Sequence, residues 1–442
     1  MKKLLSSTNI FKFWLIVLMI SLPFFSKGQA PNPALIGYFH NWQDANAPYI
    51  QLDQVDSRYN IIDVAFAIPQ QGTDFKMQFV PDQVSLSTFI SQIQTLQAQG
   101  TKVIISVGGA TAPISLDNVM ERDTFIASMT NIINTYGFDG IDIDLEGSSL
   151  SVSGGTIANP TDQPVINLIE AVKQIMANYY TTNNQRLILT MAPETAFVQG
   201  GQSAFGGIWG AYLPMINALR DSLEILHVQL YNSGSMYGID GNVYTQGTAD
   251  FIVAACEAVI QGFNTIGGMF VGLPANKIAV GLPACTMAAG GGFVDTATVR
   301  AAINYLRGNG LQPGSYILAN TNGYPTLRGM MTWSINWDAA SNCGTAYEYV
   351  QNFQTIFGTT TKITEHPEKP FYVYPNPANE RLYINFTKHL KEPTNVFICN
   401  SLGENVFSKA ISSKNQTIDI SNLPSGVYYL MLNEYRQLII KQ

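Results

Sequence analysis

Short apolar runs alternate with helical segments along residues 34–358, and this alternation restricts the fold more than any other feature. Helical spacing of apolar residues separates several runs, for example over residues 85–100 and 125–136. The runs with the length and composition of buried strands are 35–39, 61–67, 102–107, 138–147, 187–192, 225–231, 277–282 and 329–334. Eight such units predict a (β/α)8 TIM barrel of the α/β class. No glycine-rich phosphate loop follows the first strand, which argues against an open doubly wound sheet.

The fourth run, residues 138–147, alternates apolar and acidic side chains with a period of two. Asp142, Asp144 and Glu146 therefore share one face of a predicted strand, with neighbours ~6–7 Å apart. Carboxylates this close cannot all ionise at low cost, so at least one pKa should be raised, as in a general acid. Active sites of such barrels lie at the carboxyl ends of the strands. We therefore expect Asp142 deep, Asp144 midway and Glu146 at the mouth; an acidic or metal-coordinating strand is the alternative.

Polar or aromatic side chains also follow or end several other predicted strands. They include Tyr38, Trp42, Ser106, Met191, Glu194, Gln229, Tyr231, Asn232 and Trp333. In a barrel these positions converge on one mouth, so we expect them to surround the acids. His227 lies in the middle of its strand and is expected in the core.

Composition restricts the partners of this chain. Its formal net charge is −7, and the excess of acidic residues lies before residue 360, which argues against nucleic acid. Charged residues make up only 12% of the chain, which fits an extracellular protein and a neutral substrate such as a glycan. The four cysteines lack metal-type spacing and favour buried thiols, with a Cys256–Cys285 or a Cys285–Cys343 disulfide as the alternatives.

Both ends of the chain differ from its main body. Residues 1–30 combine early lysines, an apolar run and small residues, which predicts a secretory signal peptide rather than a retained anchor. The polar, proline-containing stretch 359–370 predicts a linker after a barrel domain that spans residues 31–358. Residues 371–442 form a small all-β sandwich in this prediction, with strands near 371–374, 381–386, 395–399, 416–420, 426–432 and 437–440.

These residues resemble glycoside hydrolase family 18, the chitinases and their relatives. The strand-four signature Asp-x-x-Asp-x-Asp-x-Glu is matched by Asp139, Asp142, Asp144 and Glu146. Further matches are Ser106, Gly108 and Gly109 on strand three, Gln229, Tyr231 and Asn232 on strand six, and Trp333 on strand eight. Residues 37–42 resemble the first strand of the bacterial chitinase branch.

The resemblance implies substrate-assisted catalysis, in which the 2-acetamido group of the sugar replaces a carboxylate nucleophile. It implies that Glu146 is the acid and then the base, and that Asp144 orients the acetamide and shares a proton with Asp142. Tyr231 would bond the acetamide oxygen, and Trp333 would form the floor under the sugar. Tyr38, Trp42, Met191, Glu194, Gln229 and Asn232 complete the expected substrate contacts. No cofactor or metal is expected.

The implied substrate is chitin or another N-acetylglucosamine oligosaccharide. Two alternatives are an endo-β-N-acetylglucosaminidase acting on N-glycans and a sugar-binding lectin without activity. Residues 285–328 leave little room for an inserted domain before strand eight, which predicts a shallow cleft and endo-type cutting. We also expect sugar stacking from some of the aromatic residues near strand ends, namely Trp42, Phe205, Trp209, Tyr212, Tyr237 and Trp337.

The C-terminal module resembles the sorting domain of the type IX secretion system. The resemblance rests on two stretches, residues 374–379 and 423–428. It implies that the secretion machinery is a partner and that the protein is extracellular or on the outer cell surface. A chitin-binding module is the alternative. The enzyme is expected to be a monomer.

Overall fold

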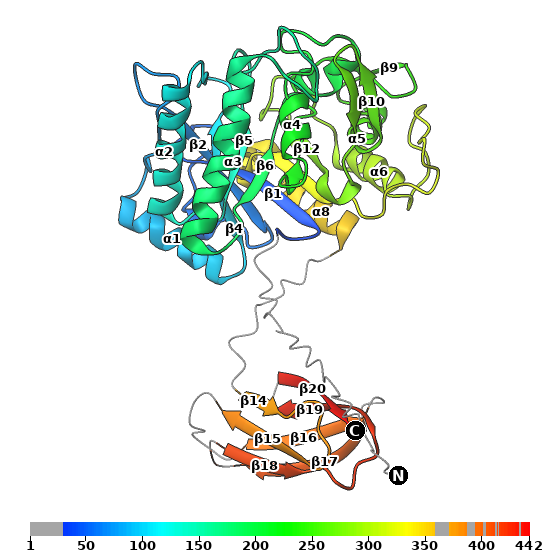
Figure 1. Ribbon diagram of the computed structural model, residues 1–442. Coiled ribbons are helices and arrows are strands. Elements are labelled where there is room, and N and C mark those ends of the chain that lie inside the picture. The colour runs from blue at the N-terminus through cyan, green and yellow to red at the C-terminus, as the bar shows by residue number, and fades with distance from the viewer. Residues whose placement is uncertain are drawn as a thin grey trace, which may run out of the picture. The chain divides into compact units, whose positions relative to one another are not determined.

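The computed structural model describes residues 30–358, 371–386, 394–400, 404–411, 413, 415–432 and 435–442. The chain divides into two compact units, residues 1–360 and 361–442 (Figure 1). The predicted signal peptide, except for Ala30, and the predicted linker 359–370 lie outside the described residues. None of the described helices is long and apolar enough to cross a bilayer.

The first unit contains eight parallel strands in the order β12-β13-β1-β2-β4-β5-β6-β7. The strands are β1 Ala34–His40, β2 Ile61–Pro69, β4 Lys102–Gly108, β5 Gly140–Asp144, β6 Ile188–Met191, β7 Ile225–Leu226, β12 Ala279–Pro283 and β13 Gly329–Trp333. Parallel bridges from Leu226 to Ile278 and from Gln229 to Gly281 join β7 to β12. These bridges close the sheet, so the predicted TIM barrel is confirmed.

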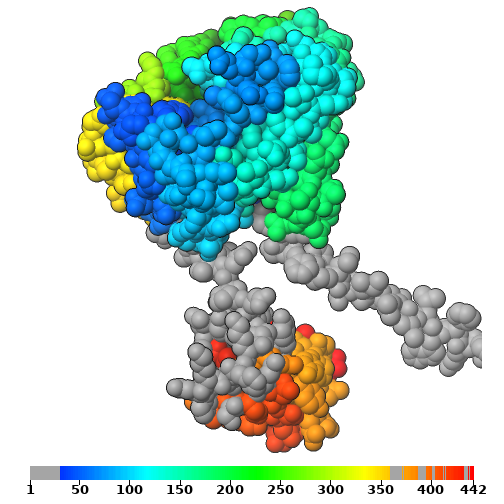
Figure 2. Space-filling model, turned by 90° about the vertical axis from the view of Figure 1, so that its left-hand side faces the viewer, coloured from blue at the N-terminus to red at the C-terminus, as the bar shows by residue number. Residues whose placement is uncertain are grey.

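Helices surround the strands in Figure 1. They are α1 Leu86–Ala98, α2 Val119–Tyr136, α3 Gln163–Asn183, α4 Leu213–Leu219, α5 Ala249–Gln261, α6 Thr296–Leu306, α7 Ile335–Ala339 and α8 Glu348–Phe357. Local sequence determines where several of these helices begin or end. Ser85 caps α1 by accepting a bond from the amide of Thr88, and Gly137 ends α2 in the left-handed region. Figure 2 shows the outer surface on the side of α1 and α2.

The described structure differs from the predicted elements in three places. The sixth strand was expected over residues 225–231, but only Ile225–Leu226 is regular, while the amides of His227 and Gln229 still bond to the neighbouring segment. Two hairpins were not predicted, β8 Ser235–Tyr237 with β9 Val243–Thr245 and β10 Gly262–Thr265 with β11 Gly268–Val271. The short strand β3 Met77–Gln78 pairs with the end of β2. In each of these places the segment is too short or too irregular for hydrophobic periodicity to predict its backbone conformation.

The barrel interior has an apolar layer beneath a polar one. A cluster of buried side chains inside the strands includes Ile36, Ile61, Ile104, Ile188 and Ile225. Residues two positions further along these strands are polar on five of them: Tyr38, Asp63, Ser106, Thr190 and His227. Side chains alternate along a strand, so both sets face the interior and the polar set lies nearer the carboxyl ends. The apolar layer therefore separates the polar groups from solvent at the other end of the barrel.

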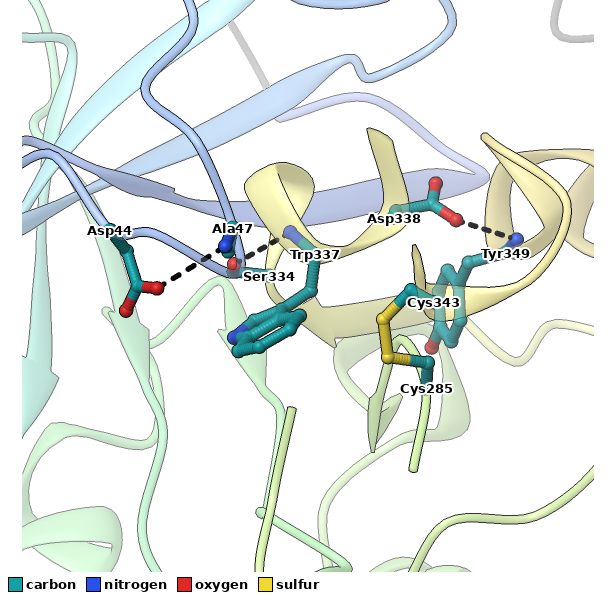
Figure 3. Close-up of a disulfide and its surroundings, with 8 residues drawn as sticks. All are labelled: Asp44, Ala47, Cys285, Ser334, Trp337, Asp338, Cys343 and Tyr349. Atoms are coloured by element: carbon teal, nitrogen blue, oxygen red, sulfur yellow. Dashed lines mark hydrogen bonds between the residues drawn. A yellow bond between two sulfur atoms is a disulfide. The ribbon is translucent and has the colours of Figure 1, made fainter. Parts of the chain in front are cut away.

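Cys285, just after β12, is joined to Cys343 by a disulfide (Figure 3). Cys343 ends a short 3-10 helix, Ser341–Cys343, and the bridge lies in a small buried cluster with Trp337. The described structure therefore selects one of the two alternative pairings, and the expectation of buried thiols holds only for Cys256 and Cys399. The spacing of cysteines could not reveal this pairing because the barrel brings β12 and the segment after β13 together.

Breaking this disulfide should destabilise the barrel unit. The bridge closes a loop of 58 residues in sequence, and a loop of that size restricts the unfolded chain by about 2–4 kcal/mol. The double variant Cys285→Ser with Cys343→Ser should melt at a lower temperature, and its melting temperature should no longer depend on reductant. An unchanged melting temperature in oxidising buffer would contradict this prediction. Differential scanning calorimetry with and without reductant measures both effects.

The second unit contains two antiparallel sheets. They are ordered β14-β15-β18 and β17-β16-β19-β20. The strands are β14 Phe371–Tyr374, β15 Arg381–Phe386, β16 Thr394–Asn400, β17 Asn405–Ile411, β18 Asn415–Asp419, β19 Gly426–Leu432 and β20 Tyr435–Lys441. Apolar side chains from both sheets form one buried cluster. The predicted all-β architecture is confirmed, although β17 was missed because its exposed polar residues hide the strand pattern.

Candidate active site

The three acids of strand β5 lie at graded depths in the barrel. Asp142 is fully buried, Asp144 is 2% exposed, and Glu146, just beyond the strand, is partly exposed. The period-two alternation of the sequence produces this arrangement, because Ile141, Ile143 and Leu145 point instead into the outer core. This is the order that the sequence predicted.

Asp142 is held by three hydroxyl donors from three different strands. Oδ2 accepts bonds from Tyr38 Oη at 2.6 Å and Ser106 Oγ at 2.7 Å, and Oδ1 accepts one from Thr190 Oγ1 at 2.7 Å. Burial by itself would raise the pKa of Asp142, but the nearby imidazole of His227 and these hydroxyls outweigh burial and lower it. Asp142 is therefore the carboxylate of the series that stays ionised.

Asp144 and Glu146 share a partner and contact each other. The Nε2 amide of Gln229 donates to Asp144 Oδ1 at 2.8 Å and to Glu146 Oε1 at 3.0 Å. Burial first, and then the charges of Glu146 and Asp142, raise the pKa of Asp144 well above its usual range. Burial also raises the pKa of Glu146, and the charge of Glu194 adds to this effect, while the Gln229 bond opposes it. At least one proton is thus retained on this pair.

The side chain of Asp144 is paired with Glu146, rather than with Asp142, in the described structure. Its side chain hydrogen-bonds to Glu146, whereas the oxygens of Asp142 are occupied by the hydroxyls of Tyr38, Ser106 and Thr190. The expectation that Asp144 shares a proton with Asp142 therefore differs from the observed pairing. The difference arises because three other strands, β1, β4 and β6, supply the donors to Asp142, and the sequence does not place these strands in space.

Two glycines allow β4 and β5 to approach closely beneath the site. The amide of Gly109 donates to the carbonyl oxygen of Asp144 at 2.7 Å. A Cβ on Gly108, which has a φ of +111°, would lie only 2.3 Å from that oxygen, and one on Gly109 would meet the ring of Phe66. These glycines therefore permit the close approach of the two strands, since a larger side chain would displace Asp144.

A cleft of about 550 Å³ opens above the acids. Asp144, Glu146, Gln229, Tyr231, Asn232, Trp42 and Trp333 line it, together with Asn41, Ala65, Phe66, Ile68, Val80, Asp82, Ala110 and Thr111. The rings of Phe66 and Trp333 are stacked, with centroids 5.9 Å apart, and Trp42 stacks on Phe66 at 6.3 Å. This aromatic wall beside the acids offers flat apolar faces of the kind that bind sugar rings.

Three of the predicted contacts lie at the mouth with distinct environments. Tyr231 is 5% exposed, and burial, followed by the charges of Asp144 and Glu146, raises its pKa well above the usual range. Its hydroxyl therefore remains a donor at any physiological pH. Asn232 is exposed and its Oδ1 accepts a bond from the amide of Gly291, while Glu194 Oε2 accepts one from the amide of Gly147.

Three predicted substrate contacts do not line the cleft: Glu194, described above, and the buried pair Met191 and Tyr38. Met191 is fully buried in the cluster between strands and helices, because the alternation of β6 points Thr190 inward and Met191 outward. Tyr38 is 1% exposed and lies beneath the acids, where its hydroxyl holds Asp142. The prediction that these residues contact substrate is wrong for this structure, since strand-end position alone does not give side-chain direction.

Most of the other aromatic residues that were expected to stack on sugars also lie outside the cleft. Tyr212 is buried, and its hydroxyl accepts a bond from the amide of Leu145, so it supports β5 from outside the cleft. Trp337 is buried in the cluster beside the disulfide (Figure 3). Phe205 packs against the core, whereas Trp209 and Tyr237 are exposed outside the cavity. Among the six aromatic candidates for stacking, Trp42 lies in the cleft.

Sequence reasoning missed two residues of the site, Phe66 and Asp63, and assigned His227 only to the core. Phe66 lies inside an apolar strand and gave no separate signal, while Asp63 is a lone acid in the same apolar run. A buried charge in such a run is rarely left without a partner, and that signal could have found it. Asp63, Asp142 and His227 bring potential ligand atoms within 4.8 Å of one another. Hydroxyl donors already occupy both oxygens of Asp142, so these residues do not present a free ligand set.

A closed (β/α)8 barrel with graded carboxylates and an aromatic wall at the carboxyl ends of its strands defines a glycoside hydrolase. A model of the glycosyl hydrolases family 18 matches residues 34–366, and the chain belongs to this family. Residues 372–442 match the secretion system C-terminal sorting domain.

The chain is similar to several characterised or solved proteins. It is 47% identical to chitinase Chi52 of Paenibacillus xylanexedens over 313 residues, which cover 70% of this chain and 59% of that one. It is 32% identical to chitinase ChiA of Flavobacterium johnsoniae over 89% of this chain and 26% of that one. The chain thus spans less than two thirds of these relatives. The structure of a family GH18 chitinase from Chromobacterium violaceum has a TM-score of 0.66 and 36% identity, covering 74% of this chain and 85% of that one.

Proposed function

We propose that this protein is a secreted chitinase that hydrolyses β-1,4 bonds between N-acetylglucosamine units with retention of configuration. The observation that carries the proposal is the series Asp142, Asp144 and Glu146, in which Asp144 and Glu146 line the cleft and both have a raised pKa. A two-carboxylate retaining enzyme needs a nucleophile ~5 Å from the acid. The strand that supplies it in common barrel glycosidases is β12 here, and it runs into Pro283-Ala284-Cys285 without an acid.

The side chains support a substrate-assisted reaction. Glu146 protonates the glycosidic oxygen as the bond to the anomeric carbon breaks, and the acetamide oxygen of the same sugar bonds to that carbon. Glu146 then takes a proton from the water that reopens the ring intermediate. Asp144 binds the acetamide N–H, and Tyr231 donates to the acetamide oxygen. Trp333, stacked on Phe66, supports the sugar from below.

Hydrolysis of N-acetylglucosamine oligomers, compared with hydrolysis of a glycoprotein bearing N-glycans, tests this proposal. Cleavage of the oligomers with first release of the β-anomer, followed by NMR, is the expected result. Cleavage of the glycoprotein alone would favour the endo-β-N-acetylglucosaminidase alternative. Binding of oligomers without cleavage would favour the lectin.

We expect endo-type cleavage because the described residues between β12 and β13 contain α6 but no added α+β domain beside the cleft. Internal bonds of long chains can then enter an open groove. Soluble chitin derivatives should lose viscosity early, before much reducing sugar appears. Early release of dimers at nearly constant viscosity would contradict this expectation. An oligomer ladder resolved by chromatography gives the same distinction.

The C-terminal unit supports export as the other part of the proposed function. Its match to a secretion system sorting domain implies recognition by the type IX machinery. The barrel carries the whole cleft in its own residues, so we propose that catalysis does not depend on the sorting unit. A monomeric state stays a prediction, which light scattering coupled to size exclusion would test.

A further inference from the structure

Beneath the acids, polar side chains meet in the sealed middle of the barrel. Tyr38 from β1, Ser106 from β4 and Thr190 from β6 all donate to Asp142. Two further groups in this layer, Asp63 from β2 and His227 just after β7, have no role in the reaction described above. Both are fully buried.

His227 faces two carboxyl groups at once. Its Nε2 lies 3.3 Å from Asp142 Oδ1 and 3.7 Å from Asp63 Oδ2. Within the described residues, neither oxygen of Asp63 and neither ring nitrogen of His227 has a well-formed hydrogen bond. A fully buried carboxylate without donors is strongly disfavoured, because nothing replaces its lost hydration. The layer can therefore hold one anionic carboxyl at low cost, but not two.

The hydrogen-bond donors show which carboxyl is the anion. Three hydroxyls point at Asp142 and none at Asp63. Consistently, burial and the charge of Asp142 raise the pKa of Asp63 well above its usual range, while the pKa of Asp142 is lowered despite burial. Among the groups that oppose the burial of Asp142, the imidazole of His227 ranks ahead of the hydroxyls.

We propose that His227 is a positioning residue for the hydrolytic reaction: it keeps Asp142 ionised from inside the barrel, with Asp63 beside it as a neutral acid. The ionised Asp142 in turn holds the proton on Asp144, which is the group that hydrogen-bonds to Glu146. His227 thus acts on the acid at the mouth through two intervening carboxyl groups. This proposal rests on the proposed hydrolytic function.

The surroundings of His227 contain few other groups that titrate. Its neighbours of that kind are Asp63, Asp142 and Tyr38, whose ring centroid lies 6.2 Å away. Burial and the neighbouring carboxylates raise the pKa of Tyr38 well above its usual range, so it stays neutral. The corresponding inward positions of β4 and β6 carry Ser106 and Thr190, and those of β12 and β13 carry Gly281 and Met331, which do not titrate. The carboxyl groups that His227 faces in this layer are therefore Asp63 and Asp142.

Replacing His227 by Asn, which is too short to reach Asp142, should raise the pKa of Asp142. As the pH is lowered, Asp142 then becomes neutral at a higher pH than in the wild type, and activity is lost at that higher pH. We expect the acid limb of the kcat profile to move upward by about one pH unit, as for removal of a group that favours the ionised form of a carboxyl. This corresponds to about a tenfold lower kcat at a pH on that limb, with little change in KM because His227 does not line the cleft. His227→Gln, whose longer amide can still donate, should shift the limb less.

Asp63→Asn should leave both limbs where they are, because an amide resembles a neutral acid in shape and charge. Glu257→Gln is the matched control: Glu257 is fully buried on α5, is bonded to Tyr316 and Tyr324, and is remote in sequence and contacts from the acids. It should lower the melting temperature without moving the profile. A wild-type profile in His227→Asn, or an equal shift in Asp63→Asn and His227→Asn, would overturn the proposal.

Infrared difference spectra provide a readout that does not depend on activity. The wild type at neutral pH should show a carbonyl band of a protonated carboxylic acid in addition to that of the Asp144 and Glu146 pair, and this additional band should be lost in Asp63→Asn. Titration of the Asp142 band, identified with Asp142→Asn, should occur at higher pH in His227→Asn than in the wild type. An unshifted titration would overturn the proposal even if the protein proved inactive on chitin. A divalent ion that copurifies with the wild type but not with His227→Asn would also overturn it.

Discussion

Glu146→Gln should abolish most of the hydrolysis of N-acetylglucosamine oligomers. The amide keeps the size of the side chain and can still bond to Gln229, but it has no proton to give to the leaving oxygen. Loss of a general acid typically costs about 10²–10⁴-fold in kcat. KM should change little, because the aromatic wall of Trp42, Phe66 and Trp333 remains intact. Initial rates on a chromogenic oligomer measure both constants.

The pH dependence gives a second test of the same residue. Burial raises the pKa of Glu146, so the acid remains protonated to a higher pH than an exposed glutamate. Activity that needs this proton is lost as the pH rises through the raised pKa. The basic limb of the wild-type profile should thus belong to the Glu146 and Asp144 pair and should be absent from the residual activity of Glu146→Gln. A basic limb at the same pH in the variant would assign that limb to another group.

Glu170→Gln provides a matched control for the substitution. Glu170 lies on α3, its side chain is 52% exposed, and it pairs with Arg122 on the outer surface. An exposed ion pair of this kind contributes little, so stability and activity should stay close to those of the wild type. Near wild-type hydrolysis by Glu146→Gln, with the control behaving as expected, would refute the catalytic assignment.

Deletion of residues 371–442 should prevent release of the enzyme from a bacterium that has a type IX system. The deleted unit has its own buried core, drawn from both of its sheets, so its removal leaves the barrel core complete. The truncated enzyme should therefore accumulate inside the cell in an active form. Immunoblots and chitinase assays of culture medium and cell fractions measure the distribution.

The full-length Glu146→Gln variant is the control for this experiment. It carries the sorting unit without the acid, so it should reach the medium like the wild type while showing little activity there. Unchanged secretion of the truncated chain would refute a sorting role for the second unit. Loss of binding to insoluble chitin on truncation, with secretion unchanged, would instead support the alternative of a chitin-binding module.

The residues at strand ends show how much of the site can be predicted from local sequence. Strand-end placement predicted that Trp42 and Trp333 line the cleft, and both do. The same reasoning failed for Met191, because β6 ends one residue out of phase with the expected orientation and turns this side chain into the outer core. A shift of one residue along a strand reverses the face, and the pairing of β6 with β5 places Thr190 beside Asp142 and Met191 beside Ile143.

Local sequence patterns were enough to predict the barrel and the acid series. Eight apolar runs spaced by helices require a closed parallel sheet, and a period-two acidic strand requires Asp142, Asp144 and Glu146 to face its interior. These results follow from local periodicity, which the chain carries in consecutive residues. Local periodicity also predicted both sheets of the second unit, apart from β17.

The charge state of the acids depends on contacts that exist only in the folded barrel. Tyr38, Asp63, Ser106, Thr190 and His227 come from five strand segments far apart in sequence, and the closed barrel brings them together around Asp142. Burial and these contacts, rather than residue type, lower one carboxyl pKa and raise the others. The same closure joins Cys285 to Cys343 across 58 residues. Such effects depend on distances between strands, and a linear pattern of residues contains no such distances.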